Sequence, residues 1–259
     1  MSAVIAHTTD LSGDDRQAFV HAAALAARSG ARLVSVHGNA AAELADRLPD
    51  ATPLGARWGH PIDHRRVCHE CCDDVTDTLL DALRSVMPGL VVTGTHARRG
   101  LAAVLHGSVS ESLARNLDVP TLVVPNRGRG FVDEGSGAID LKRVLIPAGD
   151  VATAARGLTA ARALLAVAGV TDAELMVLVV GARPLDLAAA DDVTVIRADG
   201  PLEDAVLATA RDRHACVIVM PTMGHDGVLD ALLGSHTEHV IRAAGCPVLT
   251  VPAASRRPA

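Results

Sequence analysis

The chain has 259 residues, of which 49% are hydrophobic and 21% charged, so it can bury a substantial core in one large domain or in two of modest size. Its formal net charge of −6 argues against a nucleic-acid-binding protein, which would need a basic face for the phosphates. Aromatic residues make up only 1%, which argues strongly against a platform for stacking single-stranded bases.

No segment has the features of a signal peptide or a membrane span. The first residues lack a basic stretch followed by an apolar run, and no apolar stretch reaches about 18 residues. The five cysteines are odd in number and are not spaced like a disulfide framework. We therefore expect a cytoplasmic protein that makes no contact with a membrane.

In the first half of the chain, short apolar runs alternate with longer Ala-rich or charged stretches, a pattern that predicts buried strands separated by helices. The expected elements are a strand at Val4–Thr8, a helix at Asp14–Ser29, a strand at Leu33–His37, a helix at Ala40–Leu48, a weak strand at Leu54–Trp58, a long helix ending near Val86, a strand at Leu90–Thr93, a helix opened by Gly107 and Ser108 and reaching Asn116, and a strand at Thr121–Val124.

The second half repeats this alternation. Its expected elements are a strand at Val144–Pro147, a helix at Ala152–Val167, strands at Leu175–Val180 and Val193–Arg197, a helix at Leu202–Arg213, a strand at Cys216–Met220, a helix at Ser235–Ala244 and a strand at Val248–Val251. Continuous apolar strands separated by helices predict an α/β fold with parallel sheets covered on both faces. We expect two tandem doubly wound domains of five strands each.

An internal repeat supports this division, because one offset of 127 positions relates the end of each half without gaps. The segment from Gly100 to Ser108 resembles the segment from Gly227 to Ser235. The same offset pairs Thr95 with Thr222, Glu111 with Glu238, Arg115 with Arg242, Pro120 with Pro247, Leu122 with Leu249 and Pro125 with Pro252. We assign residues 1–127 to the first domain, the Gly-rich stretch 128–141 to a linker, and residues 142–259 to the second domain.

The first domain places a candidate phosphate-binding site where its strands end. Asp10 follows the first strand, and Gly94 follows a later strand that leads to Gly107 and Ser108 at a helix start. Glycines allow the backbone to approach a phosphate closely, and the free N–H groups of a helix start favour an anion. Ser108 could donate a hydrogen bond to a phosphate, and Asp10 could bind ribose hydroxyls.

These residues resemble the ATP-binding pattern of the universal stress protein family, Gly-x2-Gly-x9-Gly-Ser/Thr with an Asp after the first strand. The resemblance covers almost all of both halves and implies a Rossmann-like fold of the adenine nucleotide alpha hydrolase type. It implies binding of ATP, with Mg²⁺ as a companion ion, at Thr8, Asp10, Gly94, Ala97, Gly107, Ser108 and Val109. Ala97 stands where the pattern has its second glycine, which weakens the match.

The second half matches the same pattern less well. Pro221 replaces the first glycine and removes a backbone donor, while Gly224, Gly234 and Ser235 match the later positions. Gly149 stands where the Asp is expected, next to Asp150. We therefore expect nucleotide binding mainly in the first half.

A segment rich in Cys and His interrupts the repeat near residues 60–75. The interval from Pro61 to Gly94 is 13 residues longer than the interval from Pro201 to Pro221, which suggests an insertion. In a helix, four of its side chains would form one stripe with a fifth beside it, a donor set that suits zinc: His60, His64, Cys68, Cys72 and Cys71. Packing of the cysteines on an apolar face and a redox pair remain the alternatives.

The sequence leaves three functions open. The first is a regulatory, non-catalytic stress-response protein that binds an adenine nucleotide. The second is a slow ATP hydrolase or an adenylate-forming relative, although the pattern contains no evident general base or Walker lysine. The third is a zinc or redox sensor that uses the Cys/His segment. We expect the two halves to pack as an intramolecular pseudo-dimer through Thr121–Val124 and Val248–Val251, with a homodimer of chains as a further option.

Overall fold

The computed structural model describes residues 3–11, 13–38, 47–68, 74–95, 109–181, 192–221 and 230–253, with the backbone alone over 230–235. The first half contains β1 (Val4–Thr8), α1 (Arg16–Ser29), β2 (Arg32–His37), α2 (Thr52–Trp58), β3 (His64–Cys68), α3 (Val75–Val86), β4 (Leu90–Thr95), α4 (Val109–Asn116) and β5 (Thr121–Pro125). The second half contains β6 (Arg143–Pro147), α5 (Val151–Ala168), β7 (Glu174–Val180), β8 (Val193–Ala198), α6 (Leu202–Asp212), β9 (Val217–Pro221), α7 (Asp230–Ala243) and β10 (Val248–Val251).

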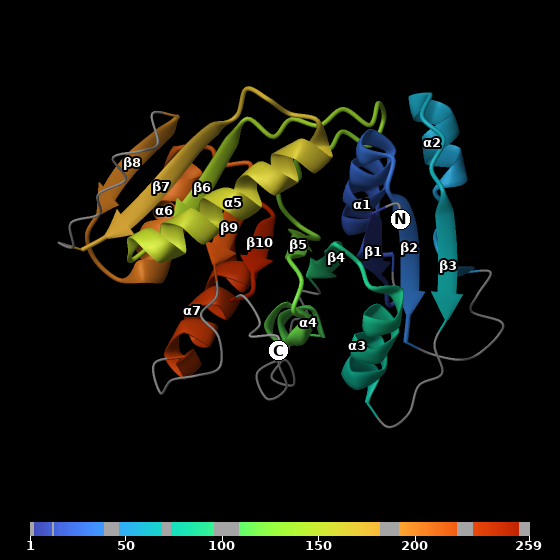
Figure 1. The fold of residues 1–259 in the computed structure, drawn as a ribbon, viewed down its shortest axis with the longest axis horizontal. Helices are drawn as coiled ribbons and strands as arrows, with labels where there is room; N and C mark the ends of the chain where they lie inside the picture. Colours follow the sequence, from blue (N-terminus) through green and yellow to red (C-terminus); the bar gives the residue numbers. More distant parts are fainter. Residues whose placement is uncertain are drawn as a thin grey trace, which may run out of the picture.

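All ten strands belong to one sheet, in the order β3-β2-β1-β4-β5-β10-β9-β6-β7-β8 (Figure 1). Every pair within a half is parallel, whereas β5 and β10 pair antiparallel with Leu122 opposite Leu249. The strands that we expected at the junction of a pseudo-dimer therefore do form it. The α/β class and the five strands per half are confirmed.

Helices cover the sheet on both faces. On one face, α1 and α5 pack against each other and over a core that draws residues from both halves. On the other face, α3 and α4 cover the first half, and α6 and α7 cover the second. The apolar strands predicted from the sequence are buried on both sides for this reason.

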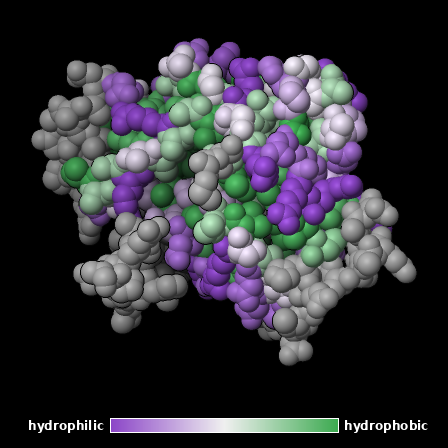
Figure 2. Space-filling model, turned by 45° about the vertical axis from the view of Figure 1, so that its right-hand side comes forward, coloured by the Kyte–Doolittle hydropathy of each residue, from purple (hydrophilic) through white to green (hydrophobic). Residues whose placement is uncertain are grey.

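Helix α5 is long and apolar enough to cross a membrane by composition, and no other helix of the described residues is. In the structure it packs on α1, β6 and β9, with Leu158 and Leu164 among its buried residues. Its apolar residues therefore form part of the protein core. On the face seen in Figure 2, hydrophilic and hydrophobic residues are interspersed over the described part of the chain.

Two predictions between β2 and α3 are wrong. Leu54–Trp58, expected as a strand, belongs to helix α2, which has a proline in its first turn and ends at Gly59 in the left-handed conformation (φ 70°). His64–Cys68, expected within a helix, forms the edge strand β3 and pairs in parallel with β2. The predicted helix at Ala40–Leu48 lies largely outside the described residues.

The additional residues of the first half lie before β3. Between β2 and β3 there are 26 residues, whereas 12 residues separate β7 from β8. Asp74 and Pro201, the N-caps of α3 and α6, are 127 positions apart, so the repeat is already in register there. The expected insertion at the Cys/His segment is therefore misplaced: the extra chain carries α2, and the repeat pairs Pro201 with Asp74 rather than with Pro61.

The segment 126–142, which we call the strap, joins β5 to β6 and packs closely on the first half. Phe131 is buried, and Val132 pairs with Ile139 in an isolated β-bridge. The indole of Trp58 donates to the Glu134 carbonyl oxygen (3.0 Å). The Gly-rich composition that predicts a linker therefore belongs to an ordered element.

Two ion pairs related by the repeat join α4 to α7 across the junction. The guanidinium of Arg242 donates two bonds to the carboxylate of Glu111, both at 2.7 Å. Arg115 pairs reciprocally with Glu238. Glu111 is 5% exposed, so its carboxylate has lost most of its water and depends on this bidentate contact. The bond also raises the pKa of Arg242.

We expect Arg242→Ala to lower the free energy of unfolding by about 1–2 kcal/mol, because the buried carboxylate of Glu111 loses charge-assisted hydrogen bonds. Arg84→Ala is the matched control: its pair with Asp81 (3.0 Å) is exposed, and its loss should cost less than about 0.5 kcal/mol. Urea unfolding of both variants measures the difference. Equal effects would show that the junction does not depend on this contact.

Candidate functional site at the ends of β1 and β4

The sheet of the first half has a switch point between β1 and β4. From β1 the chain passes to β2 through α1 on one face, and from β4 it passes to β5 through α4 on the other face. A crevice opens at the carboxyl ends of two such strands, and ligands of doubly wound folds bind there. In the second half, β6 and β9 are the corresponding strands.

Buried hydrogen bonds fix the floor of this crevice. Thr8 Oγ1 donates to Thr93 Oγ1 (2.8 Å), which ties the end of β1 to β4. Ser110 Oγ donates to the carbonyl oxygen of Gly94 (2.5 Å), which ties the first turn of α4 to the end of β4. A Cβ at Gly94 would lie 3.3 Å from Asp15 Cα, so glycine lets β4 pack tightly against the start of α1.

The loop after β1 presents Asp10 at the rim. Leu11 adopts a left-handed conformation (φ 63°), and its N–H donates to Thr9 Oγ1 (3.0 Å). The N–H of Thr9 donates to the Val36 carbonyl oxygen (3.1 Å), and His37 Nδ1 donates to the Thr9 carbonyl oxygen (2.8 Å). These bonds attach the loop to the end of β2. Asp10 is exposed between them.

The predicted residues of the first half that the structure describes lie at one edge of the sheet: Thr8, Asp10, Gly94 and Val109. Val109 is the first residue of α4 that the structure describes, and the N-terminal end of a helix favours an anion. The hydroxyl of Thr8 already donates its hydrogen bond to Thr93. Ala97, Gly107 and Ser108 lie outside the described residues.

In the second half, two of the predicted residues do not stand at a helix start. Helix α7 already includes Asp230, so the N–H groups of Gly234 and Ser235 lie within the helix, where an α-helix bonds them to carbonyl groups four residues earlier. Gly224 lies outside the described residues. Only residues 148–150 separate β6 from α5, whereas residues 9–15 separate β1 from α1. Asp150 caps α5 by accepting from the Thr153 N–H (2.7 Å).

A chain of polar contacts crosses β3, β2 and β1 beneath the first-half site. The Ala51 N–H donates to His64 Nδ1 (3.2 Å), so the neutral His64 ring carries its proton on Nε2 and donates to Ser35 Oγ (2.9 Å). The Ser35 hydroxyl then faces His7 Nδ1 at 3.4 Å. This order places the His7 proton on Nε2, 3.9 Å from Asp15 Oδ2, and directs every proton of the chain toward the start of α1.

Ser35, His64 and Asp50 have the composition of a hydrolase triad but not its proton order. In a triad the serine donates to the histidine, whereas here His64 donates to Ser35, which is fully buried. Burial, helped by the charge of His64, lowers the pKa of His7 to about 3, and burial lowers the pKa of His64 against the opposing effect of Asp50. Both rings are neutral near pH 7, and the chain links β3, β2 and β1.

The structure does not support the helical zinc stripe. His64 and Cys68 lie in strand β3, and both ring nitrogens of His64 already have hydrogen-bond partners. His60 lies outside the strand, and Cys71 and Cys72 lie outside the described residues. Among the residues that the structure describes, no three His, Cys, Asp or Glu side chains gather as metal ligands. Burial raises the pKa of Cys68, which disfavours the reactive thiolate of a redox site.

A family model, the universal stress protein family, matches residues 62–125 and 147–252. The chain belongs to the universal stress protein family. A universal stress protein from Archaeoglobus fulgidus is similar over 97% of this chain and 99% of its own, with a TM-score of 0.64 and 17% identity. A functionally unknown protein from Pseudomonas aeruginosa is similar over 98% and 93%, with a TM-score of 0.70 and 14% identity. Among curated proteins, no sequence matches.

In this universal stress protein, sequence reasoning missed His7 and Ser35 as members of the polar chain. Both lie in strands that are otherwise apolar and buried on both sides, where a polar side chain needs a partner. The sequence shows these two polar residues within apolar strands. It does not show their partner His64, because that residue comes from an edge strand that was expected to be helical.

We expect Ser35→Ala to lower the free energy of unfolding by about 1–3 kcal/mol, since it leaves the buried Nε2–H of His64 without an acceptor. Ser85→Ala is the matched control, because Ser85 is exposed and bonds only to the Ala82 carbonyl oxygen of its own helix (2.7 Å). Its cost should stay within about 0.5 kcal/mol. Chemical unfolding at pH 7.5 compares the two variants. A Ser35→Ala variant as stable as the wild type would contradict the hydrogen-bond order given above.

Proposed function

We propose that this universal stress protein is a regulatory, non-catalytic protein that binds ATP in its first half, at the carboxyl ends of β1 and β4. The observation that carries the proposal is the exposed Asp10 at the switch point, two residues beyond Thr8, which pairs with Thr93 of β4. Members of the family bind nucleotides, and the described part of the site offers groups suited to one.

The ribose and the phosphates of the nucleotide each have suitable groups in this half. The carboxylate of Asp10 would accept hydrogen bonds from the ribose hydroxyls. The N–H groups at the N-terminal end of α4, with Ala97, Gly107 and Ser108, would bind the phosphates. Mg²⁺ would accompany the phosphates as their counter-ion.

In this proposal the second half is structural. Its short loop after β6, its capping Asp150 and the helical position of Gly234 support one nucleotide per chain. The second half instead supplies β10 and α7, against which β5 and α4 pack. We also propose a cytoplasmic location for the protein.

Binding without turnover is the expected chemistry. Lys142, the one lysine of the sequence, lies just before β6 near Asp140 (3.8 Å), far along the chain from Asp10 and Gly94. The buried Ser35 and His64 have the wrong proton order to activate a nucleophile. Regulation through occupancy of the site is therefore the role that we favour over hydrolysis.

Calorimetric titration with ATP and Mg²⁺ at pH 7.5 tests the proposal. We expect about one equivalent to bind, and Asp10→Ala to weaken binding at least about tenfold, because hydrogen bonds to a charged group contribute about 1.5–3 kcal/mol. Asp150→Ala is the matched control in the other half. It should lose about 1 kcal/mol of stability by removal of the α5 cap and leave the affinity unchanged.

Three results would contradict the proposal. The first is absence of ATP binding to the folded wild-type chain. The second is equal weakening by Asp10→Ala and Asp150→Ala, which would place the nucleotide elsewhere. The third is steady release of phosphate that Asp10→Ala abolishes, which would make the protein an enzyme.

A further inference from the structure

A buried histidine of α1 contacts the strap. His21 is fully buried, and its Nδ1 lies 2.7 Å from the Gln17 carbonyl oxygen. A carbonyl oxygen only accepts, so Nδ1 carries the proton and Nε2 is an acceptor. The N–H of Phe131 donates to Nε2 (3.0 Å), and the ring of Phe131 packs edge-on against the imidazole with centroids 4.5 Å apart.

This contact is incompatible with a charged imidazole. Protonation would place an N–H on Nε2, directed at the N–H of Phe131, and would leave a cation in a fully buried site. The backbone of Gly130 packs closely against the ring, since a Cβ there would lie 2.4 Å from His21 Cε1. Protonated His21 and a docked Phe131 therefore exclude each other.

The strap also connects parts of the molecule that lie apart in the sequence. Glu134 forms an ion pair with Arg16 at the start of α1, with bonds of 2.6 and 3.1 Å. The backbone N–H of Arg129 donates to the carbonyl oxygen of Gly245 (2.7 Å), which lies just before β10 in the second half. Release of Phe131 would loosen the segment that carries both contacts.

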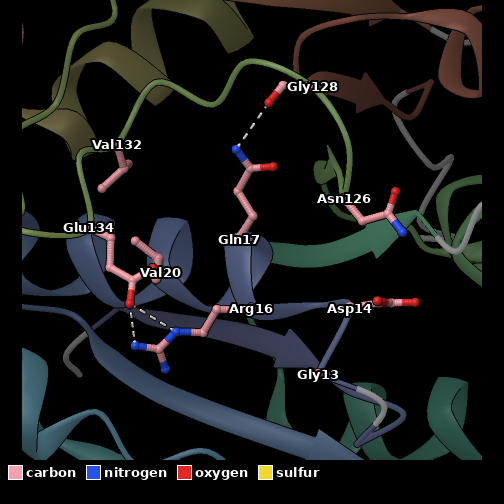
Figure 3. Close-up of a pocket in the computed structure, with 9 residues that line it drawn as sticks. All are labelled: Gly13, Asp14, Arg16, Gln17, Val20, Asn126, Gly128, Val132 and Glu134. Atoms are coloured by element: carbon pink, nitrogen blue, oxygen red, sulfur yellow. Dashed lines mark hydrogen bonds and ion pairs between the residues drawn. The ribbon is translucent and has the colours of Figure 1, made fainter.

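A pocket of about 400 Å³ lies between the strap and the start of α1 (Figure 3). Its walls come from two segments, one at the start of α1 and one in the strap: Gly13, Asp14, Arg16, Gln17 and Val20, and Asn126, Gly128, Val132 and Glu134. The first segment follows the loop that presents Asp10. The strap therefore forms one wall of a pocket next to the candidate nucleotide site.

We propose that His21 is a proton-sensitive latch, whose protonation releases Phe131 and the strap from α1 and so moves one wall of this pocket. The latch does not depend on nucleotide binding. It joins the position of the strap to the start of α1 and, through Gly245, to the second half.

Burial has the largest effect on the pKa of His21 and lowers it to about 4. The hydrogen bond to the Gln17 carbonyl oxygen opposes this shift. The strands β4 and β5 carry no ionisable side chain. The other ionisable groups on α1, the strap and α5 are Arg16 and Arg28 on α1, Arg127, Arg129, Asp133, Glu134, Asp140 and Lys142 on the strap, and Arg156 and Arg162 on α5.

The sign of the pH dependence follows from this shift. Above pH 6.5 His21 is neutral whether the strap is docked or released, and the docked form is fully favoured. Between pH 6.5 and about 4 the released form binds the extra proton, so the docked form loses up to about tenfold in relative population per pH unit. The latch therefore opens as the pH falls.

Amide hydrogen exchange of the full chain from pH 7.5 to 4.5, corrected for the intrinsic rates, tests the latch. We expect the protection factor of the Phe131 amide to fall at least about tenfold between pH 6.5 and 4.5 in the wild type. The amide of Val177, in the centre of β7, should stay protected. His21→Gln should remove the pH dependence, and His60→Gln, at an exposed histidine, should keep it.

Nitrogen NMR of the wild-type imidazoles provides a second measurement that does not depend on the variant folding. His21 should carry its proton on Nδ1 at pH 7.5 and gain a second proton in step with the loss of Phe131 protection. Unchanged protection of Phe131 at pH 4.5, the same pH dependence in a folded His21→Gln, a proton on Nε2 at pH 7.5, or parallel loss of protection at Val177 would each overturn the latch.

Discussion

The antiparallel pairing of β5 with β10 is the contact on which the rest of the molecule depends. Each half alone is a five-stranded parallel sheet that would expose the backbone groups of one apolar edge strand. Pairing these edges satisfies both strands and fuses the two sheets into one. It also brings α1 against α5 on one face and α4 against α7 on the other, so that one core extends through both halves. The ion pairs between α4 and α7 stabilise the same junction from outside.

Elements with strong local signals were predicted well. The buried strands are continuous apolar runs, and the long helices α1 and α5 end at Gly30 and Gly169, so the existence and order of these elements could be predicted from the sequence. Strand β3 could not, because its residues His64–Cys68 are polar and partly exposed at the edge of the sheet. Helix α2 carried a usable signal in Pro53 and Gly59, but its seven residues were too few to show a period.

The candidate site was predictable where its residues follow strands or precede a helix. Asp10, Gly94 and Val109 lie in such places, which sequence alone locates. The contacts among His7, Ser35 and His64 join three strands, and the docking of Phe131 on His21 joins residues 110 positions apart. Such contacts depend on packing. The Gly-rich strap shows this most clearly, since its composition indicated a flexible linker.

The reciprocal ion pairs between α4 and α7 affect how such a chain can evolve. In a dimer of identical subunits, a substitution at either position of the pair would appear twice, on both sides of the symmetry axis. In this chain Glu111, Arg115, Glu238 and Arg242 are four separate positions. Each side of the axis can therefore vary alone, and one half is free to lose a binding site while it continues to complete the sheet of the other.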